Sequence, residues 1–172
     1  MFRKMRRYTQ ALPESEALEI LKKSSSGTLA LLGDEGYPYA VPLSYVYAGG
    51  RLYFHCAKEG HKIDAIKNCS KASFCVVAED NVVAEEFTTY FKSVIAFGRI
   101  RIIEEASEIR RFIEILSDKY CPVGEELRNK EIDGAMSRLC MLEFSIEHLT
   151  GKEAKELRAM SDVDWIKEIF ES

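Results

Sequence analysis

Two apolar runs on either side of a glycine pair decide the architecture of this chain. Between residues 37 and 47 every second side chain is apolar or aromatic, which is the period of a β-strand with one buried face. The alternating residues are Tyr39, Val41, Leu43, Tyr45 and Tyr47. Ala48, Gly49 and Gly50 then supply a turn, and residues 51–57 form the second run. Strands joined by so short a turn are antiparallel neighbours.

Other parts of the chain repeat the same pattern. Further strands are predicted at residues 28–32, 72–78, 90–103 and 139–146. Amphipathic helices are predicted at residues 14–23, 61–68 and 106–120. Most connections between strands are too short for the crossover helices of a parallel sheet. About six strands with flanking helices therefore predict an α+β, mainly β, fold built on an antiparallel, barrel-like sheet.

Two residues predict irregularities in these strands. Pro42 cannot donate a ladder hydrogen bond, so it indicates an edge, a bulge or a place where the sheet opens. Gly98, inside the long run 90–103, indicates a bulge or a bend.

The size and charge of the chain exclude several classes of protein. Its 172 residues are enough for one domain that buries roughly two-thirds of the surface of the unfolded chain. The net charge of -4 argues against nonspecific binding to nucleic acid or to an anionic membrane. No stretch approaches the ~20 apolar residues of a membrane helix. We expect residues 1–150 to form the domain, and residues 151–172 to form a helical tail on that domain or on its dimer mate.

The five cysteines indicate a reducing compartment. Their count is odd and they contain no CxxC pair, which fits neither a disulfide framework nor a zinc site. The basic N-terminus, residues 1–7, is not followed by the apolar core of a signal peptide. We therefore expect a cytoplasmic protein with reduced thiols and no metal site.

A strand, a glycine loop and a helix start follow one another between residues 52 and 66. A helix N-terminus presents free amides and a partial positive charge. Lys58, His61 and Lys62 add charged or hydrogen-bonding side chains within a few residues. Proteins build a pocket for one phosphate group in this way. The alternative is a solvated basic loop with a capping role.

Three stretches, residues 36–47, 52–66 and 91–98, resemble the pyridoxamine 5′-phosphate oxidase-like superfamily of FMN-binding proteins, and within it the nitroimidazole-resistance (Nim) type. The most specific motif is the segment Glu-Gly-His-Lys-Ile-Asp at residues 59–64, in its strand-to-helix setting. The resemblance covers roughly residues 1–150. It implies a split β-barrel that forms a homodimer and holds two FMN molecules at the dimer interface.

The resemblance also implies roles for individual residues. Residues 39–43 would line the flavin ring, residues 55–57 would meet the ribityl chain and the phosphate, and Ser93 would meet the ring. His61 and Lys62 match the basic pair that holds the phosphate, and the Nim-type histidine that matches His61 is proposed to be at the active site. His61 is therefore the candidate catalytic residue. The predicted cofactor-binding residues are Tyr39, Ala40, Val41, Pro42, Leu43, His55, Cys56, Ala57, Lys58, His61, Lys62 and Ser93.

The predicted function is that of an FMN-dependent oxidoreductase with a small aromatic or nitro compound as substrate. Relatives that oxidise pyridoxamine phosphate carry an Arg-Lys pair where this chain has His61 and Lys62, and a C-terminal arginine and histidine segment that this sequence does not show. These departures argue against vitamin B6 oxidation. Two alternatives remain open: a non-catalytic FMN-binding or flavin-sensing protein, and a split barrel that binds haem or a deazaflavin.

Overall fold

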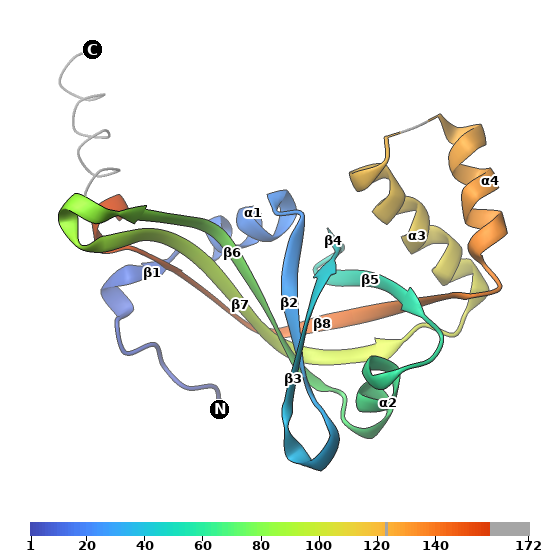
Figure 1. Ribbon diagram of the computed structural model, residues 1–172, viewed down its shortest axis with the longest axis horizontal. Coiled ribbons are helices and arrows are strands. Elements are labelled where there is room, and N and C mark those ends of the chain that lie inside the picture. Colours follow the sequence, from blue (N-terminus) through green and yellow to red (C-terminus); the bar gives the residue numbers. More distant parts are fainter. Residues whose placement is uncertain (123, 159–172) are drawn as a thin grey trace.

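The computed structural model describes residues 1–122 and 124–158 as one strongly curved antiparallel sheet with helices around it (Figure 1). The strands are β1 (Ala11–Leu12), β2 (Ser26–Leu32), β3 (Pro38–Ser44), β4 (Val46–Ala48), β5 (Arg51–Ala57), β6 (Lys71–Val83), β7 (Thr88–Ile102) and β8 (Leu139–Glu153). The helices are α1 (Glu14–Lys23), α2 (His61–Asn68), α3 (Ala106–Tyr120) and α4 (Glu125–Ala135), with short 3-10 turns at Tyr8–Gln10, Asp34–Gly36 and Ala84–Glu86. The predicted α+β, mainly β, class is confirmed.

The order of the strands shows how the sheet closes. Neighbouring strands run β3-β2-β6-β7-β8-β5-β4, and β1 pairs with β8. Strands β3 and β4 lie at opposite ends of this order, yet only Tyr45 separates them in the chain. The sheet must therefore curve until its ends meet. In the described residues β3 contacts β5 without a ladder between them, so the barrel stays open along a seam between β3 and β5. This is the expected split β-barrel, with Pro42 on the edge strand β3.

Tyr45 fixes the corner where β3 turns into β4. Its side chain is fully buried, and its hydroxyl donates to the carbonyl of Leu21 at 2.7 Å. Its backbone N–H donates to the hydroxyl of Tyr120 at 2.9 Å, and its carbonyl accepts from the Lys119 ammonium at 3.0 Å. Backbone groups at a corner lose their ladder partners and need others when buried. The C-terminal turn of α3 supplies those partners and so determines the shape of the seam.

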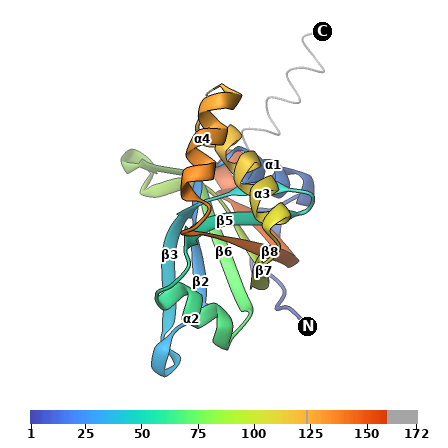
Figure 2. The same ribbon diagram turned by 90° about the vertical axis from the view of Figure 1, so that its right-hand side faces the viewer.

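Two apolar cores lie on the two faces of the sheet. Inside the barrel, side chains from β2, β5, β6, β7 and β8 pack with α1 and α2. The largest fully buried side chains there are Tyr45, Phe54, Phe74 and Phe144. Outside it, α3 and α4 cover part of β5 and β8, with Tyr53 stacked on Phe112 at 3.6 Å between ring centroids. Each such aromatic side chain contributes about 1.5–3 kcal/mol through burial. Figures 1 and 2 show α3 and α4 side by side, away from α2.

The three predicted helices have the predicted bounds. Each of them has an acidic residue in its first turn and a basic residue in its last turn, which favours helix ends at these places. The sequence predicted about six strands, whereas the described residues contain eight. The two-residue β1 has no periodicity to detect, and the run 37–47 breaks into β3 and β4 at Tyr45. Helix α4 was not predicted, because it buries only Ile132 in its described length.

The long strands differ from their predicted lengths at their ends. β6 and β7 continue past the barrel as a two-stranded ribbon, which is green in Figure 1. The predicted irregularity at Gly98 is confirmed, because the β7–β8 register shifts between Phe97 and Gly98. A Cβ at Gly98 would lie 2.0 Å from the carbonyl oxygen of Ser145, so only glycine fits there. β8 includes residues 151–153, and residues 159–172 of the predicted tail lie outside the described residues.

None of the helices in the described ranges combines the length and the apolar character needed to span a membrane.

Candidate functional site

The seam of the barrel brings together the three segments that the sequence singled out. β3 forms one side of the seam, the end of β5 forms the other, and the loop after β5 leads into α2. Helix α2 packs against β2 and β7, and in both ribbon views it lies at the same end of the molecule as the β2–β3 turn (Figures 1 and 2). The candidate site is therefore one continuous surface region, because the barrel does not close there.

The start of α2 has unused hydrogen-bond donors. The amides of Ile63 and Asp64 donate to the carbonyl of Gly60, at 2.8 and 3.2 Å. The amides of His61 and Lys62 find no acceptor among the described residues, and no side chain caps the helix. Gly60 has a φ of 113°, and a Cβ built on it meets nothing within 4 Å, so the space in front of the helix is open. This arrangement suits an anion such as a phosphate.

Lys58 and Lys62 add positive charge to that space. No described carboxylate lies within 4.0 Å of either ammonium group. Desolvation by neighbouring groups, and then the charge of Lys62, lowers the pKa of His55, although the residue is exposed on its strand, so the ring favours its neutral form. Lys62 therefore acts toward the end of β5, and its charge is not neutralised by a neighbouring side chain.

The side chain of His61 lies against β3 and the β2–β3 turn. Its ring stacks on that of Tyr39 with 4.1 Å between centroids, and its Nε2 lies 3.6 Å from a carboxylate oxygen of Asp34. Gly33 lies directly behind, because a Cβ there would be 3.2 Å from the His61 Nε2. The imidazole is thus placed against β3 and the β2–β3 turn. Within the basic pair, the charge of Lys62 therefore acts on His55 at the end of β5, whereas the ring of His61 contacts Tyr39 on β3.

Residues 39–43 divide between the two faces of β3. The side chains of Tyr39, Val41 and Leu43 pack against the barrel core, whereas Ala40 and Pro42 are exposed on the outer face. β3 is a terminal strand of the sheet, so one edge of its backbone lacks a strand partner in the described residues. A ligand at the seam could meet this backbone edge and the ring of Tyr39.

Residues 55–57 likewise alternate. Cys56 packs against the barrel core, while His55 and Ala57 are exposed on the opposite face. Cys56 lies directly opposite Cys140 on β8. Sequence reasoning missed Cys140 as a neighbour of the site. The alternation of strand 139–146 places it on the inner face, but only the β5–β8 register brings it to Cys56.

Ser93 does not join the other predicted residues within this chain. It lies on β7, where it pairs with Val77 on β6 and Lys152 on β8. Two strands separate β7 from β3 in the sheet order. At about 4.8 Å per strand, Ser93 lies roughly 14 Å from β3 when measured along the sheet.

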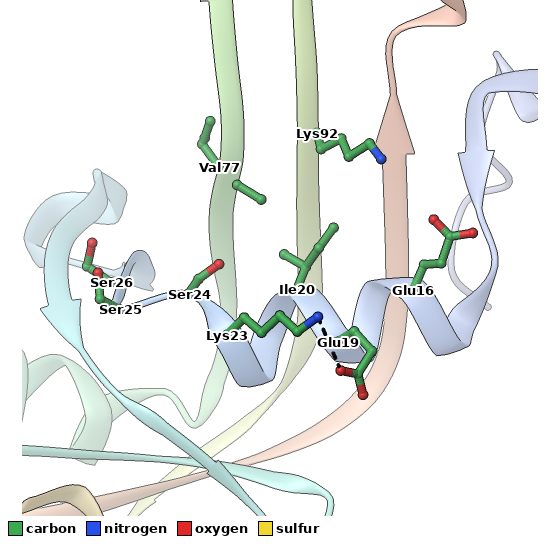
Figure 3. A pocket seen from close by; sticks show the side chains of 10 residues that line it. Glu16, Glu19, Ile20, Lys23, Ser24, Ser25, Ser26, Val77 and Lys92 are labelled. Carbon is green, nitrogen blue, oxygen red and sulfur yellow. Dashed lines mark ion pairs between the residues drawn. The ribbon is translucent and has the colours of Figure 1, made fainter. Parts of the chain in front are cut away.

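A hollow of about 580 Å³ lies elsewhere, between α1, the start of β2 and the β6–β7 ribbon. Figure 3 shows Glu16, Glu19 and Lys23 of α1 along one side of it and Lys92 of β7 on another. It contains none of the predicted cofactor-binding residues.

Comparisons with known proteins agree with this fold. A family model for pyridoxamine 5′-phosphate oxidase matches residues 13–153. No curated protein sequence matches the chain at a significant level.

Solved structures share the architecture at low sequence identity. A conserved hypothetical protein of Mycobacterium tuberculosis has a TM-score of 0.76 at 17% identity, over 90% of this chain and 92% of its own. A candidate 5-nitroimidazole antibiotic resistance protein of Bacteroides thetaiotaomicron has a TM-score of 0.72 at 19% identity, over 83% of this chain and 86% of its own. The FAD and heme binding protein of Mycobacterium smegmatis has a TM-score of 0.71 at 22% identity, over 85% of this chain and 74% of its own. With most of its length matched by the family model and its split barrel shared with these structures, this chain belongs to the pyridoxamine 5′-phosphate oxidase family.

Proposed function

We propose that this protein is an FMN-dependent oxidoreductase whose cofactor phosphate binds at the start of α2. The observation that carries the proposal is a set of donors without a protein acceptor: the amides of His61 and Lys62, and the ammonium groups of Lys58 and Lys62. Charge-assisted hydrogen bonds of this kind contribute about 1.5–3 kcal/mol each. A phosphate dianion supplies the missing acceptor, so the residues present fit the group.

The seam offers a place for the rest of the cofactor. The phosphate at α2 would direct the ribityl chain past residues 55–57, and the ring would lie along the free edge of β3. Pro42 donates no hydrogen bond there, while the exposed Ala40 adds no bulk to the outer face. Bound FMN supplies the electron-accepting ring, and the chain supplies orientation and hydrogen bonds. Stacked on Tyr39, His61 is the protein's candidate proton donor on the β3 side of the seam.

We infer that a second copy of this chain completes the site. The outer face of β6 and β7 exposes Val77, Ile95 and Phe97, and the Phe2 ring lies 5.7 Å from that of Phe97. Contiguous exposed apolar surface of this kind favours association. Ser93 lies on the same face, so Ser93 of a second copy could approach the ring although the residue is remote from β3 in its own chain. Phe97→Glu should yield monomers by analytical ultracentrifugation and weaken FMN binding. A wild-type protein that is monomeric with FMN bound would contradict this assembly.

The substrate class is proposed on the premise that the seam leaves one face of the flavin ring open. A small aromatic or nitro compound could stack on a flavin that the seam leaves accessible, and the similar fold of the Bacteroides protein is consistent with that choice. The name of the Mycobacterium smegmatis protein supports a second candidate, a barrel that binds haem as well as a flavin. A non-catalytic flavin-binding role is the third.

An absorbance spectrum of the purified protein, followed by a binding comparison, tests the proposal. FMN gives a band at about 450 nm and haem one at about 400 nm. FMN should bind at least about tenfold more tightly than riboflavin, because riboflavin lacks the phosphate that the start of α2 is proposed to hold. Equal affinities would remove the phosphate assignment. Reoxidation of the reduced, FMN-loaded protein by a nitroaromatic acceptor separates an enzyme from a carrier.

A further inference from the structure

Two cysteines meet at the base of the candidate site. In the β5–β8 ladder Cys56 pairs with Cys140, between the pairs His55–Met141 and Ala57–Leu139. Both side chains belong to the inner face of the barrel, where Cys140 is 6% exposed and Cys56 is partly exposed. Both thiols are free, and their residues are direct partners in the β5–β8 ladder.

The spacing of an antiparallel pair is close to that of a disulfide. Directly opposed residues have Cα atoms about 4.5–5.5 Å apart, within the range of about 4.4–6.8 Å found in disulfides. Their Cβ atoms lie about 4.5–5.5 Å apart, against about 3.5–4.5 Å in a disulfide. An approach of about 1 Å at the ends of two strands is enough to join the sulfurs, so the backbone needs no rearrangement.

The surroundings make one of the two sulfurs nucleophilic. The hydrogen bond from Cys56 lowers the pKa of Cys140 to about 7, against the effect of burial. The charges of Lys58, Lys62 and Lys67 act in the same direction. The same hydrogen bond, with burial, raises the pKa of Cys56. Near neutral pH, Cys140 is therefore the more acidic thiol of the pair, and Cys56 keeps its proton.

We propose that Cys56 and Cys140 form an oxidisable dithiol, which a hydroperoxide converts into an intrachain disulfide between β5 and β8. The Cys140 thiolate attacks one peroxide oxygen, the O–O bond breaks, and the sulfur becomes a sulfenic acid while the second oxygen leaves as water or an alcohol after protonation. The Cys56 sulfur then displaces the hydroxyl group, which leaves as water as the S–S bond forms. Two thiols lose two electrons and two protons, and one hydroperoxide is reduced.

The three remaining cysteines provide the contrast. Cys69 is partly exposed just after α2, Cys75 lies on the outer face of β6, where burial raises its pKa, and Cys121 is exposed just after α3. None of the three is opposite another cysteine in the described sheet. Specific disulfide formation should therefore involve Cys56 and Cys140, whereas oxidation of exposed thiols alone would favour Cys121.

The test uses the full-length protein as purified, reduced and then freed of reductant. Hydrogen peroxide is added, remaining thiols are alkylated, and tryptic peptides are mapped without reduction. We expect the peptides 52–58 and 139–152 to be joined, and dithiothreitol to separate them. The rate of closure should rise as the pH increases toward about 7 and level off above it. Cys75→Ser and Cys121→Ser should leave the yield unchanged.

Single variants separate a specific pair from general oxidation. Cys56→Ser should lower disulfide yield at least about tenfold and leave a Cys140 sulfenic acid that dimedone traps. Cys140→Ser should leave Cys56 largely unoxidised. If peroxide leaves the two wild-type peptides unlinked while Cys121 is oxidised, or joins another pair, the proposal is wrong. Should Cys140→Ser fail to fold, the wild-type peptide map still decides.

Discussion

The start of α2 and the cluster around Glu143 gather the same kinds of side chain and use them in opposite ways. We define the Glu143 cluster as Arg51, Tyr53, Arg101 and Glu143, on the α3 side of the sheet. There the carboxylate, 4% exposed, accepts from Arg101 at 2.8 Å, from Tyr53 at 3.2 Å and from Arg51 at 3.3 Å. At the start of α2, Lys58 and Lys62 face no described carboxylate within 4.0 Å.

The difference teaches where to look for function in such a barrel. A buried carboxylate needs hydrogen-bond donors. Arg51, Tyr53 and Arg101 donate to Glu143, and these bonds hold three strands in register. Cations without a protein partner contribute little to stability and remain available to a ligand. Changes in the Glu143 cluster should therefore alter folding and spare ligand binding, and changes at the start of α2 should do the reverse.

His61 has the largest expected effect and lies between these two types of site. It has protein partners, Tyr39 and Asp34, yet its side chain is 42% exposed. Because those partners turn the imidazole toward β3, we expect it to donate a proton near the reacting face. His61→Ala should lower turnover of the FMN-saturated protein by about 100-fold or more, as for loss of general acid catalysis. Rates of nitroaromatic reduction at saturating FMN measure this.

His61→Gln distinguishes a proton donor from a hydrogen-bond donor, because glutamine donates but does not titrate. If His61→Gln restores both binding and turnover, His61 is a hydrogen-bond donor to the cofactor and the acid role is wrong. If His61→Ala weakens FMN binding but leaves the turnover of the FMN-saturated protein unchanged, His61 binds the phosphate and does not take part in the reaction.

Removal of the Glu143 charge should have the next largest effect. Glu143→Gln removes the buried carboxylate that Arg51 and Arg101 share and leaves Arg101 only its longer pair with Glu108, so we expect it to lower the free energy of unfolding by about 3 kcal/mol. Urea denaturation measures this, with Glu147→Gln as the matched control, because Glu147 forms an exposed pair with Arg99 and should cost less than about 0.5 kcal/mol. Equal losses in the two variants, or a weaker affinity for FMN in Glu143→Gln, would break the contrast between the two clusters.

Lys62→Ala should show the reverse pattern. We expect FMN binding to weaken by about 1.5–3 kcal/mol, since a charge-assisted hydrogen bond to the phosphate is lost. Unfolding in the absence of FMN should be unchanged. Lys67→Ala, in the last turn of the same helix, removes the same charge away from the N-terminus. Titrations of protein fluorescence with FMN compare the variants, and similar losses for Lys62 and Lys67 would indicate a diffuse field rather than a site.

The smallest effect is a dependence of stability on pH. Burial would raise the pKa of Glu143, but hydrogen bonds and charges from Arg101, Arg51 and Tyr53 hold it below the ordinary 4.5. A carboxylate with a lowered folded-state pKa stabilises the fold above pH 4.5, and this stabilisation is lost as the pH falls through the folded-state value. The stability difference between wild type and Glu143→Gln should therefore shrink below pH 4.5. A constant difference down to pH 2 would show that the charge is not responsible.

The candidate site was predicted in pieces, and the structure decides which pieces meet. Tyr39 and His61 were predicted from separate segments and are stacked in the structure. Ser93 was predicted for the same cofactor but lies several strands away from β3. Cys140 could not be assigned to the site, because pairing with Cys56 depends on the β5–β8 register. Local patterns identify a residue's type and face, while strand order and register identify its neighbours.

The sequence by itself determined the elements with strong local signals. The alternation at residues 37–47, the end charges of α1 and the glycine start of α2 depend on neighbours a few positions apart, so they can be read in order along the chain. Only the tertiary structure decided that β3 and β5 meet without pairing. That seam exists because Tyr45 is held by Leu21, Lys119 and Tyr120, residues 24, 74 and 75 positions away in the chain. No local pattern encodes contacts at such separations, and the open edge on which the proposed function depends is their product.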